Sequence, residues 1–318
     1  MRVVSLLFLC AALAGSSAHA QETTHLLVVV GLGGEAASAD AFHQWAISVR
    51  TAAEKKLGIP RAQIAYLGEK TERDAAQIDG RSTRESIGVE IQKIAARARP
   101  GDTVALVLIG HGSAAAGEAR FNLPGPDLSG SELAKLLEPL ATQKLVLVNA
   151  FSSSGDFLKP LAGKNRVIVA ATKSGIEKNE SVFGKFWSEA IAGDVADVDK
   201  DGRVSMAEAF DYAKQQVAGS YEKDNRLLTE HAVLEDGQSG ALARGTFLGG
   251  AARTAEAPSG DPRVAQLEKE RRALEDRVET LKAQKDALQA DVYEKELERL
   301  LLELALKGEA IRAAKGGK

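Results

Sequence analysis

The sequence predicts an α/β fold, a mostly parallel β-sheet with helices on both faces, followed by a separate helical tail. Two observations support this prediction. Between residues 25 and 247, short apolar runs alternate with longer amphipathic stretches, as in domains built from successive strand and helix units. After a segment rich in Ala, Ser, Gly and Pro at 251–262, leucines recur at intervals of seven residues, which is typical of a coiled coil.

The first twenty residues have the pattern of a secretory signal peptide. Arg2 supplies the positive charge, and residues 3–14 form an apolar segment that is too short to cross a bilayer. Ala18 and Ala20 are the small residues that precede a cleavage site. We therefore expect a signal peptide at 1–20 and a mature protein that is periplasmic or secreted.

Composition excludes several classes of function. The predicted cleavage removes Cys10, the only cysteine, so the mature chain has no disulfide, no thiolate metal ligand and no cysteine nucleophile. The formal net charge of −3 gives no electrostatic case for binding nucleic acid. No segment after the signal peptide is long and apolar enough for a membrane span.

The elements of the globular part follow from apolar runs and from the residues that end them. Gly58 and Pro60 end the first helix, Ser82 and Glu85 form a capping box for the second, and Ser129 or Ser131 caps the third. Functional residues of such sheets gather beyond the carboxyl ends of the strands. Strands are predicted at 25–30, 63–67, 103–110, 144–149, 165–172 and 230–234, and helices at 38–57, 82–99, 127–140, 182–191 and 205–217.

The tail, residues 263–318, has the pattern of a coiled-coil helix. Polar Arg271 and Lys285 interrupt the seam, and the last leucines continue it in a shifted register, which indicates a stutter. We expect the tail to join copies of the chain into a homo-oligomer; the alternative is a single amphipathic helix folded onto its own domain. The seam residues are Val264, Leu267, Leu274, Val278, Leu281, Leu288 and Val292, followed by Leu297, Leu300 and Leu304.

Residues 197–208 match the twelve-residue calcium loop of an EF-hand at each diagnostic position. Gly202 allows the sharp turn, and Val204 anchors the loop in the core. Four carboxylates in twelve residues repel one another unless a hard cation lies among them, whereas the alternative is a solvated acidic turn. The residues expected to bind Ca²⁺ are Asp197, Asp199, Asp201, Arg203 through its backbone carbonyl, Ser205 and Glu208.

Two short motifs lie at the ends of neighbouring predicted strands. Leu108-Ile-Gly-His-Gly-Ser113 ends one strand, and Asn149-Ala-Phe-Ser-Ser-Ser-Gly155 ends the next. Over residues 24–236 this arrangement resembles the caspase and legumain-like peptidases. The resemblance implies a three-layer αβα sandwich over residues 21–250.

Carried over residue by residue, the resemblance makes His111 the catalytic histidine and Gly112 the glycine whose amide helps to form the oxyanion hole. It also places Phe151 at the nucleophile position. A phenyl ring has no lone pair with which to attack a carbonyl, so cysteine peptidase activity is not expected. His111 and Gly112 are then vestigial.

Three interpretations of the function remain open. The first is an exported, calcium-binding pseudopeptidase whose strand-end rim binds a peptide or protein, with Phe151 as a hydrophobic contact. The second is an active hydrolase that uses His111, either with a neighbouring serine such as Ser152 or Ser113 or as an unrecognised peptidase. The third is a calcium-stiffened scaffold that oligomerises through its tail. Asp156 and Glu177 are expected at the rim without an assigned role, and His231 is expected to be structural.

Overall fold

The structure is a computed structural model that describes residues 22–115, 118–249 and 289–316, together with individual positions between 263 and 281. The predicted signal peptide at 1–20 and the predicted linker at 251–262 lie outside the described residues. Within the described part of the chain, no helix is both long enough and apolar enough to cross a membrane.

A seven-stranded sheet forms the centre of the globular part, with the strand order β10-β9-β8-β4-β1-β2-β3. Neighbouring strands are parallel, except that β10 runs antiparallel to β9 at one edge. This arrangement confirms the predicted mostly parallel sheet. The strands are β1 (Thr24–Val30), β2 (Ile64–Gly68), β3 (Gly80–Arg81), β4 (Thr103–Gly110), β8 (Lys144–Phe151), β9 (Arg166–Ala170) and β10 (Val233–Glu235).

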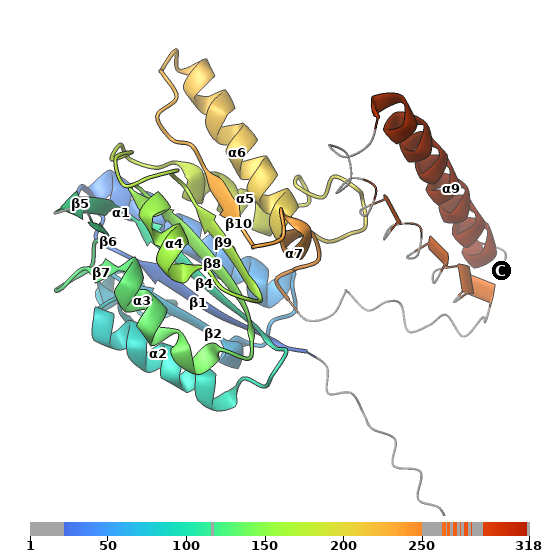
Figure 1. The fold of residues 1–318 in the computed structure, drawn as a ribbon. Helices are drawn as coiled ribbons and strands as arrows, with labels where there is room; N and C mark the ends of the chain where they lie inside the picture. The colour runs from blue at the N-terminus through green and yellow to red at the C-terminus, as the bar shows by residue number, and fades with distance from the viewer. Residues whose placement is uncertain are drawn as a thin grey trace, which may run out of the picture.

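Helices cover both faces of the sheet, as predicted (Figure 1). Side chains alternate along each strand, so Val148 of β8 packs toward one helical layer and Leu147 toward the other. Both faces are therefore apolar, as expected of a parallel sheet buried between layers. One layer holds α1 (Ala36–Lys55), α5 (Phe183–Ala192) and α6 (Met206–Lys223), and the other holds α2 (Arg84–Arg97), α3 (Gly130–Leu136) and α4 (Leu158–Leu161).

Several short elements escaped the sequence analysis. A three-stranded antiparallel sheet, in the order β5-β6-β7, follows β4 directly. Its strands span two to four residues and contain few β-branched side chains, so they lack the pattern of a strand. The additional elements are β5 (Gly112–Ala115), β6 (Glu118–Phe121), β7 (Leu128–Ser129), α7 (Ala241–Arg244) and the 3₁₀ turns η1 (Arg61–Gln63), η2 (Thr71–Arg73), η3 (Glu138–Leu140) and η4 (Ser154–Phe157).

One of the two predicted helix caps differs from the structure. Thr83, rather than Ser82, caps α2, because the Thr83 hydroxyl accepts a hydrogen bond from the amide of Ser86. The cap of α3 is as predicted, since Ser129 and Glu132 form a reciprocal capping box.

Described residues from the first part of the tail lie beside α9, so the described residues do not fit one continuous helix. Lys307 of α9 (Ala290–Gly316) lies 2.7 Å from Glu270, and Glu296 lies 3.8 Å from Arg277. In a continuous helix, residues 37 positions apart would lie about 55 Å from each other. Described residues from the two parts of the tail therefore pack side by side, an arrangement here called the hairpin. Its small core consists of Leu274, Val278, Leu281 and Leu300, with Tyr293, Leu297 and Leu304 packed against it.

Candidate metal centre and strand-end rim

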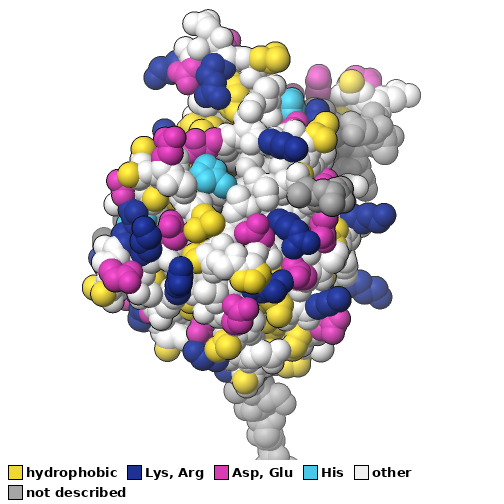
Figure 2. Space-filling view, turned by 90° about the vertical axis from the view of Figure 1, so that its left-hand side faces the viewer, with side chains coloured by type: hydrophobic (Ala, Val, Ile, Leu, Met, Phe, Trp, Pro, Cys, Tyr) yellow, Lys and Arg dark blue, Asp and Glu magenta, His cyan; other side chains and the backbone are white. Residues whose placement is uncertain are grey.

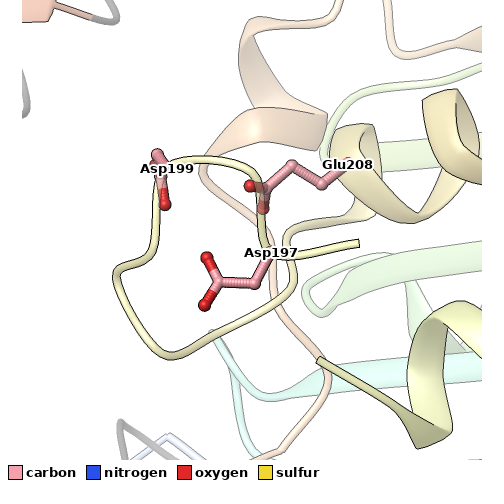
Figure 3. A group of neighbouring side chains, drawn as sticks. All are labelled: Asp197, Asp199 and Glu208. Atoms are coloured by element: carbon pink, nitrogen blue, oxygen red, sulfur yellow. The ribbon is translucent and has the colours of Figure 1, made fainter. Parts of the chain in front are cut away.

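The loop between α5 and α6 brings three carboxylates together (Figure 3). One oxygen from each of Asp197, Asp199 and Glu208 lies within 4.8 Å of the others. Glu208 occupies the first turn of α6, so that helix fixes its position relative to the loop. This group could hold a metal ion, as the spacing of the acidic residues predicts.

Backbone geometry closes the loop around these side chains. Gly202 has a φ of 84°, which only glycine adopts without strain, and its amide donates to Asp197 Oδ2 at 3.0 Å. The amide of Val198 donates to Glu208 Oε1 at 2.9 Å. These two bonds point the carboxylates toward the inside of the loop.

The carboxylate of Asp197 gives independent evidence of a ligand. This side chain is 6% exposed, and its buried Oδ1 accepts no hydrogen bond from any described residue. A buried, unpartnered carboxylate oxygen costs about 1–3 kcal/mol or more. Burial and the neighbouring Asp201 raise the pKa of Asp199 to about 6. A bound cation would remove both penalties, because it satisfies Oδ1 and favours the ionised form of Asp199.

The cluster contains three of the six predicted ligands, and the other three, Asp201, Arg203 and Ser205, have contacts within or beside the loop. Asp201 Oδ1 accepts the amide of Arg203 at 2.7 Å. The Ser205 hydroxyl caps α6: it accepts the Glu208 amide at 3.2 Å and donates to Glu208 Oε2 at 2.9 Å. Arg203 is predicted to bind through its backbone carbonyl, and its guanidinium lies 3.5 Å from the ring centroid of Phe247. The structure thus brings together Asp197, Asp199 and Glu208. Asp201, the Arg203 carbonyl and Ser205 stay predicted ligands, and the Ser205 hydroxyl also caps α6.

The strand-end rim is the edge of the sheet beyond the carboxyl ends of its strands, and His111 lies there, directly after β4. Its Nε2 lies 3.1 Å from the carbonyl oxygen of Gly33, and its ring packs edge-on against Phe42 of α1 at 5.0 Å. His111 therefore lies on the α1 side of the sheet. The contacts with Gly33 and Phe42 hold the imidazole in place. Among the described residues, no carboxylate orients the ring.

Phe151 lies on the opposite side of the sheet. It is 0% exposed, and its ring packs against Phe121 at 4.9 Å and against Phe157 at 5.0 Å. Its side chain belongs to the core under α2 and α3, whereas His111 faces α1. The two side chains therefore pack on different sides of the sheet. The expectation that Phe151 contacts a ligand at the rim was wrong, because alternation along β8 turns it into the core.

Gly112 and Ser152 form two hydrogen bonds with each other. The Gly112 amide donates to Ser152 Oγ at 3.0 Å, and that hydroxyl donates to the Gly112 carbonyl at 3.1 Å. The amide is thus engaged, so the oxyanion-hole role implied by the resemblance does not apply in this arrangement. Ser152, Ser153 and Ser154 are at most 2% exposed, and Ser113 donates to Asn122 at 2.9 Å. A serine nucleophile at this rim has no geometric support.

The structure brings together one rim pair that the sequence analysis missed. His231 Nδ1 lies 2.6 Å from Glu177 Oε1, and Glu177 Oε2 accepts the amides of Lys173 and His231. Burial acts to raise the pKa of Glu177, but these hydrogen bonds outweigh it and lower that pKa below its ordinary value. The partners lie 54 residues apart on unrelated segments, so no local pattern in the sequence indicates the pair.

A second missed group is Glu230, whose buried carboxylate lies at the start of α5. It accepts the amides of Val182 and Phe183, each at 3.0 Å, and the hydroxyl of Ser181. Burial raises the pKa of Glu230. This carboxyl group caps α5 and ties the segment before β10 to that helix.

The surface around the strand ends has mixed charge. Figure 2 shows Lys and Arg side chains interspersed with Asp and Glu on this face, so it presents no large region of a single sign. The chain matches no model of a known protein family, and no curated protein matches it either.

Proposed function

We propose that the protein is an exported, calcium-binding member of the caspase/legumain-like group that lacks cysteine peptidase activity. The main support for the calcium site is the buried Asp197 Oδ1. This atom accepts no hydrogen bond from the described residues, and it faces the carboxylates of Asp199 and Glu208. The location of Phe151 in the core, across the sheet from His111, supports the absence of peptidase chemistry.

The chemistry of the ligands favours calcium over other ions. The cluster offers only carboxylate oxygens, which suit hard cations, whereas zinc and copper sites draw on thiolate or imidazole. Calcium accepts six to eight oxygens in irregular geometry, so backbone carbonyls and water can complete the shell. Magnesium demands a near-octahedral arrangement and keeps most of its own water. An exported protein meets high calcium, which makes a permanently filled structural site the expected state.

A melting experiment tests the calcium proposal. We expect Ca²⁺ to raise the melting temperature of residues 21–318 relative to EDTA, and to do so more than Mg²⁺ does. At a calcium concentration one hundred times Kd, the stabilisation is about 2.7 kcal/mol. Glu208→Gln should abolish the response, and Glu222→Gln, an exposed acid on the same helix, should retain it. An equal response of the Glu208→Gln variant and wild type would contradict the proposed site.

The binding part of the proposal concerns the rim beside the Glu177–His231 pair. Ile176 is 82% exposed there, next to a carboxylate and an imidazole fixed by hydrogen bonds. A bound peptide or protein would cover Ile176 and could pair with the fixed polar groups around it. Ile176, in place of the buried Phe151, is the hydrophobic contact that we propose.

A second proposal, self-association through the tail, rests on leucines that the hairpin leaves uncovered. Leu302 and Leu306 lie one turn apart on α9 and are 61% and 57% exposed. A second copy of the hairpin would cover this face. We expect Leu302→Glu with Leu306→Glu to reduce the molecular mass of the assembly in sedimentation equilibrium. Val89→Glu, at an exposed position of α2, should leave it unchanged; a monomeric wild type would refute the proposal.

A further inference from the structure

The chain leaves the globular part through residues 246–249, here called the exit segment, which leads toward the tail. This segment follows α7, and α7 lies beside the start of α6, where the acidic loop ends (Figure 1). The exit segment is therefore next to the candidate metal centre, although some forty residues separate the two in sequence.

Three contacts join the loop to the exit segment. Ser205 and Phe247 form an antiparallel β-bridge. The amide of Met206 donates to the carbonyl of Thr246 at 2.8 Å. The guanidinium of Arg203 lies 3.5 Å from the Phe247 ring centroid, and burial lowers the pKa of this arginine. A partly desolvated cation over an aromatic ring contributes about 0.5–2 kcal/mol at other sites, so Phe247 is held from two sides.

The opposite side of the exit segment packs on the end of α1. Gly249 has a φ of 103°, and a Cβ at this position would lie 2.5 Å from the carbonyl oxygen of Leu57. Leu248 is 6% exposed and belongs to the core. A cavity of about 370 Å³ remains between the loop and α1, bordered by Arg203, Val204, Phe247 and Leu248. The exit segment thus fills only part of the space between the acidic loop and the end of α1.

Ser205 connects the carboxylate cluster to this segment. Glu208, one of the three clustered carboxylates, accepts both the amide and the hydroxyl of Ser205 at 2.9 Å. Ser205 in turn pairs with Phe247. Any change in how Glu208 is held therefore acts on the strand-like pairing of the exit segment.

We propose that metal binding at the loop clamps the exit segment onto the globular part and so controls how the tail is attached. This inference rests on the proposed calcium site and adds a regulatory role to it. Without the ion, repulsion among Asp197, Asp199 and Glu208 loosens the loop, and the bridge to Phe247 opens with it. By linkage, a weaker bridge must also weaken calcium binding.

Hydrogen–deuterium exchange of the full mature chain tests the clamp. With Ca²⁺ in place of EDTA, exchange should slow in peptides covering 197–208 and, in parallel, in peptides covering 246–249. Protection of 197–208 alone would overturn the clamp and leave the calcium site standing. Protection of neither peptide would overturn the calcium site itself, so the two failures are distinguishable.

Variants of the exit segment separate the clamp from a general loss of stability. Phe247→Ala should weaken calcium binding, measured by titration calorimetry, by about fivefold or more, which is the lower range of coupling between linked sites. Thr246→Val keeps the carbonyl that Met206 contacts and removes only the hydroxyl bond to Leu242, so its calcium affinity should match wild type. Equal calcium affinity of Phe247→Ala and wild type would refute the coupling.

Discussion

Phe151→Ala is expected to lower the free energy of unfolding by about 3–5 kcal/mol. The side chain is fully buried between Phe121 and Phe157, and its ring contacts both. The truncation removes apolar surface from the core and leaves a cavity that the two neighbouring rings can fill only in part. Urea denaturation of the mature chain measures the loss. Val89→Ala, at a position 52% exposed, should change the same quantity by less than about 0.5 kcal/mol.

The variant Phe151→Cys tests whether position 151 lies in the core or at the strand-end rim. The mature chain has no other cysteine after the predicted cleavage, so one thiol reports on this position alone. We expect the thiol to react with a maleimide only after unfolding, because Phe151 is 0% exposed. Peptidase activity should not appear, since His111 faces α1 on the other side of the sheet. Rapid labelling of the folded variant would contradict the structure at this strand end.

Short apolar strands were predictable because their signal is local. The strand Thr103–Gly110 has the bounds that its continuous apolar run predicts, and β8 extends only two residues beyond its prediction. Burial on both faces forces this pattern on a parallel sheet, whatever its function. The small sheet at 112–129 was missed, because its strands take their stability from packing over Phe151 and not from β-propensity.

The candidate sites also differ in whether their signal in the sequence is local. The acidic cluster lies within twelve consecutive residues, so spacing alone predicts it. The Glu177–His231 pair joins segments whose proximity depends on the order of strands, which spacing does not encode. The leucine repeat of the tail predicts a helical partner, but it does not say whether that partner belongs to another chain. In the hairpin, part of the seam packs against α9 of the same chain.

Glu230→Ala is the second large effect that we expect. The Glu230 carboxylate accepts the amides of Val182 and Phe183 at the start of α5, and its removal leaves both buried groups without this acceptor. The Phe183 amide keeps its 3.3 Å bond to Ser181 Oγ, so the Val182 amide loses its acceptor and the free energy of unfolding should fall by about 1–3 kcal/mol. Glu180→Ala, at an exposed position nearby, should have a much smaller effect in the same urea measurement. Similar losses for the two variants would contradict the capping role of Glu230.

The pH dependence of stability gives an independent measure of the same group. Burial raises the pKa of Glu230 above its ordinary value of 4.5, so the unfolded chain releases this proton at a lower pH than the folded chain does. As pH rises from about 4.5 toward the folded pKa, the folded state binds more protons, and the free energy of unfolding must fall. Glu230→Gln cannot titrate. The stability of wild type relative to this variant should therefore decrease over that interval. An increase would mean that the hydrogen bonds from α5 outweigh burial and hold the carboxylate ionised.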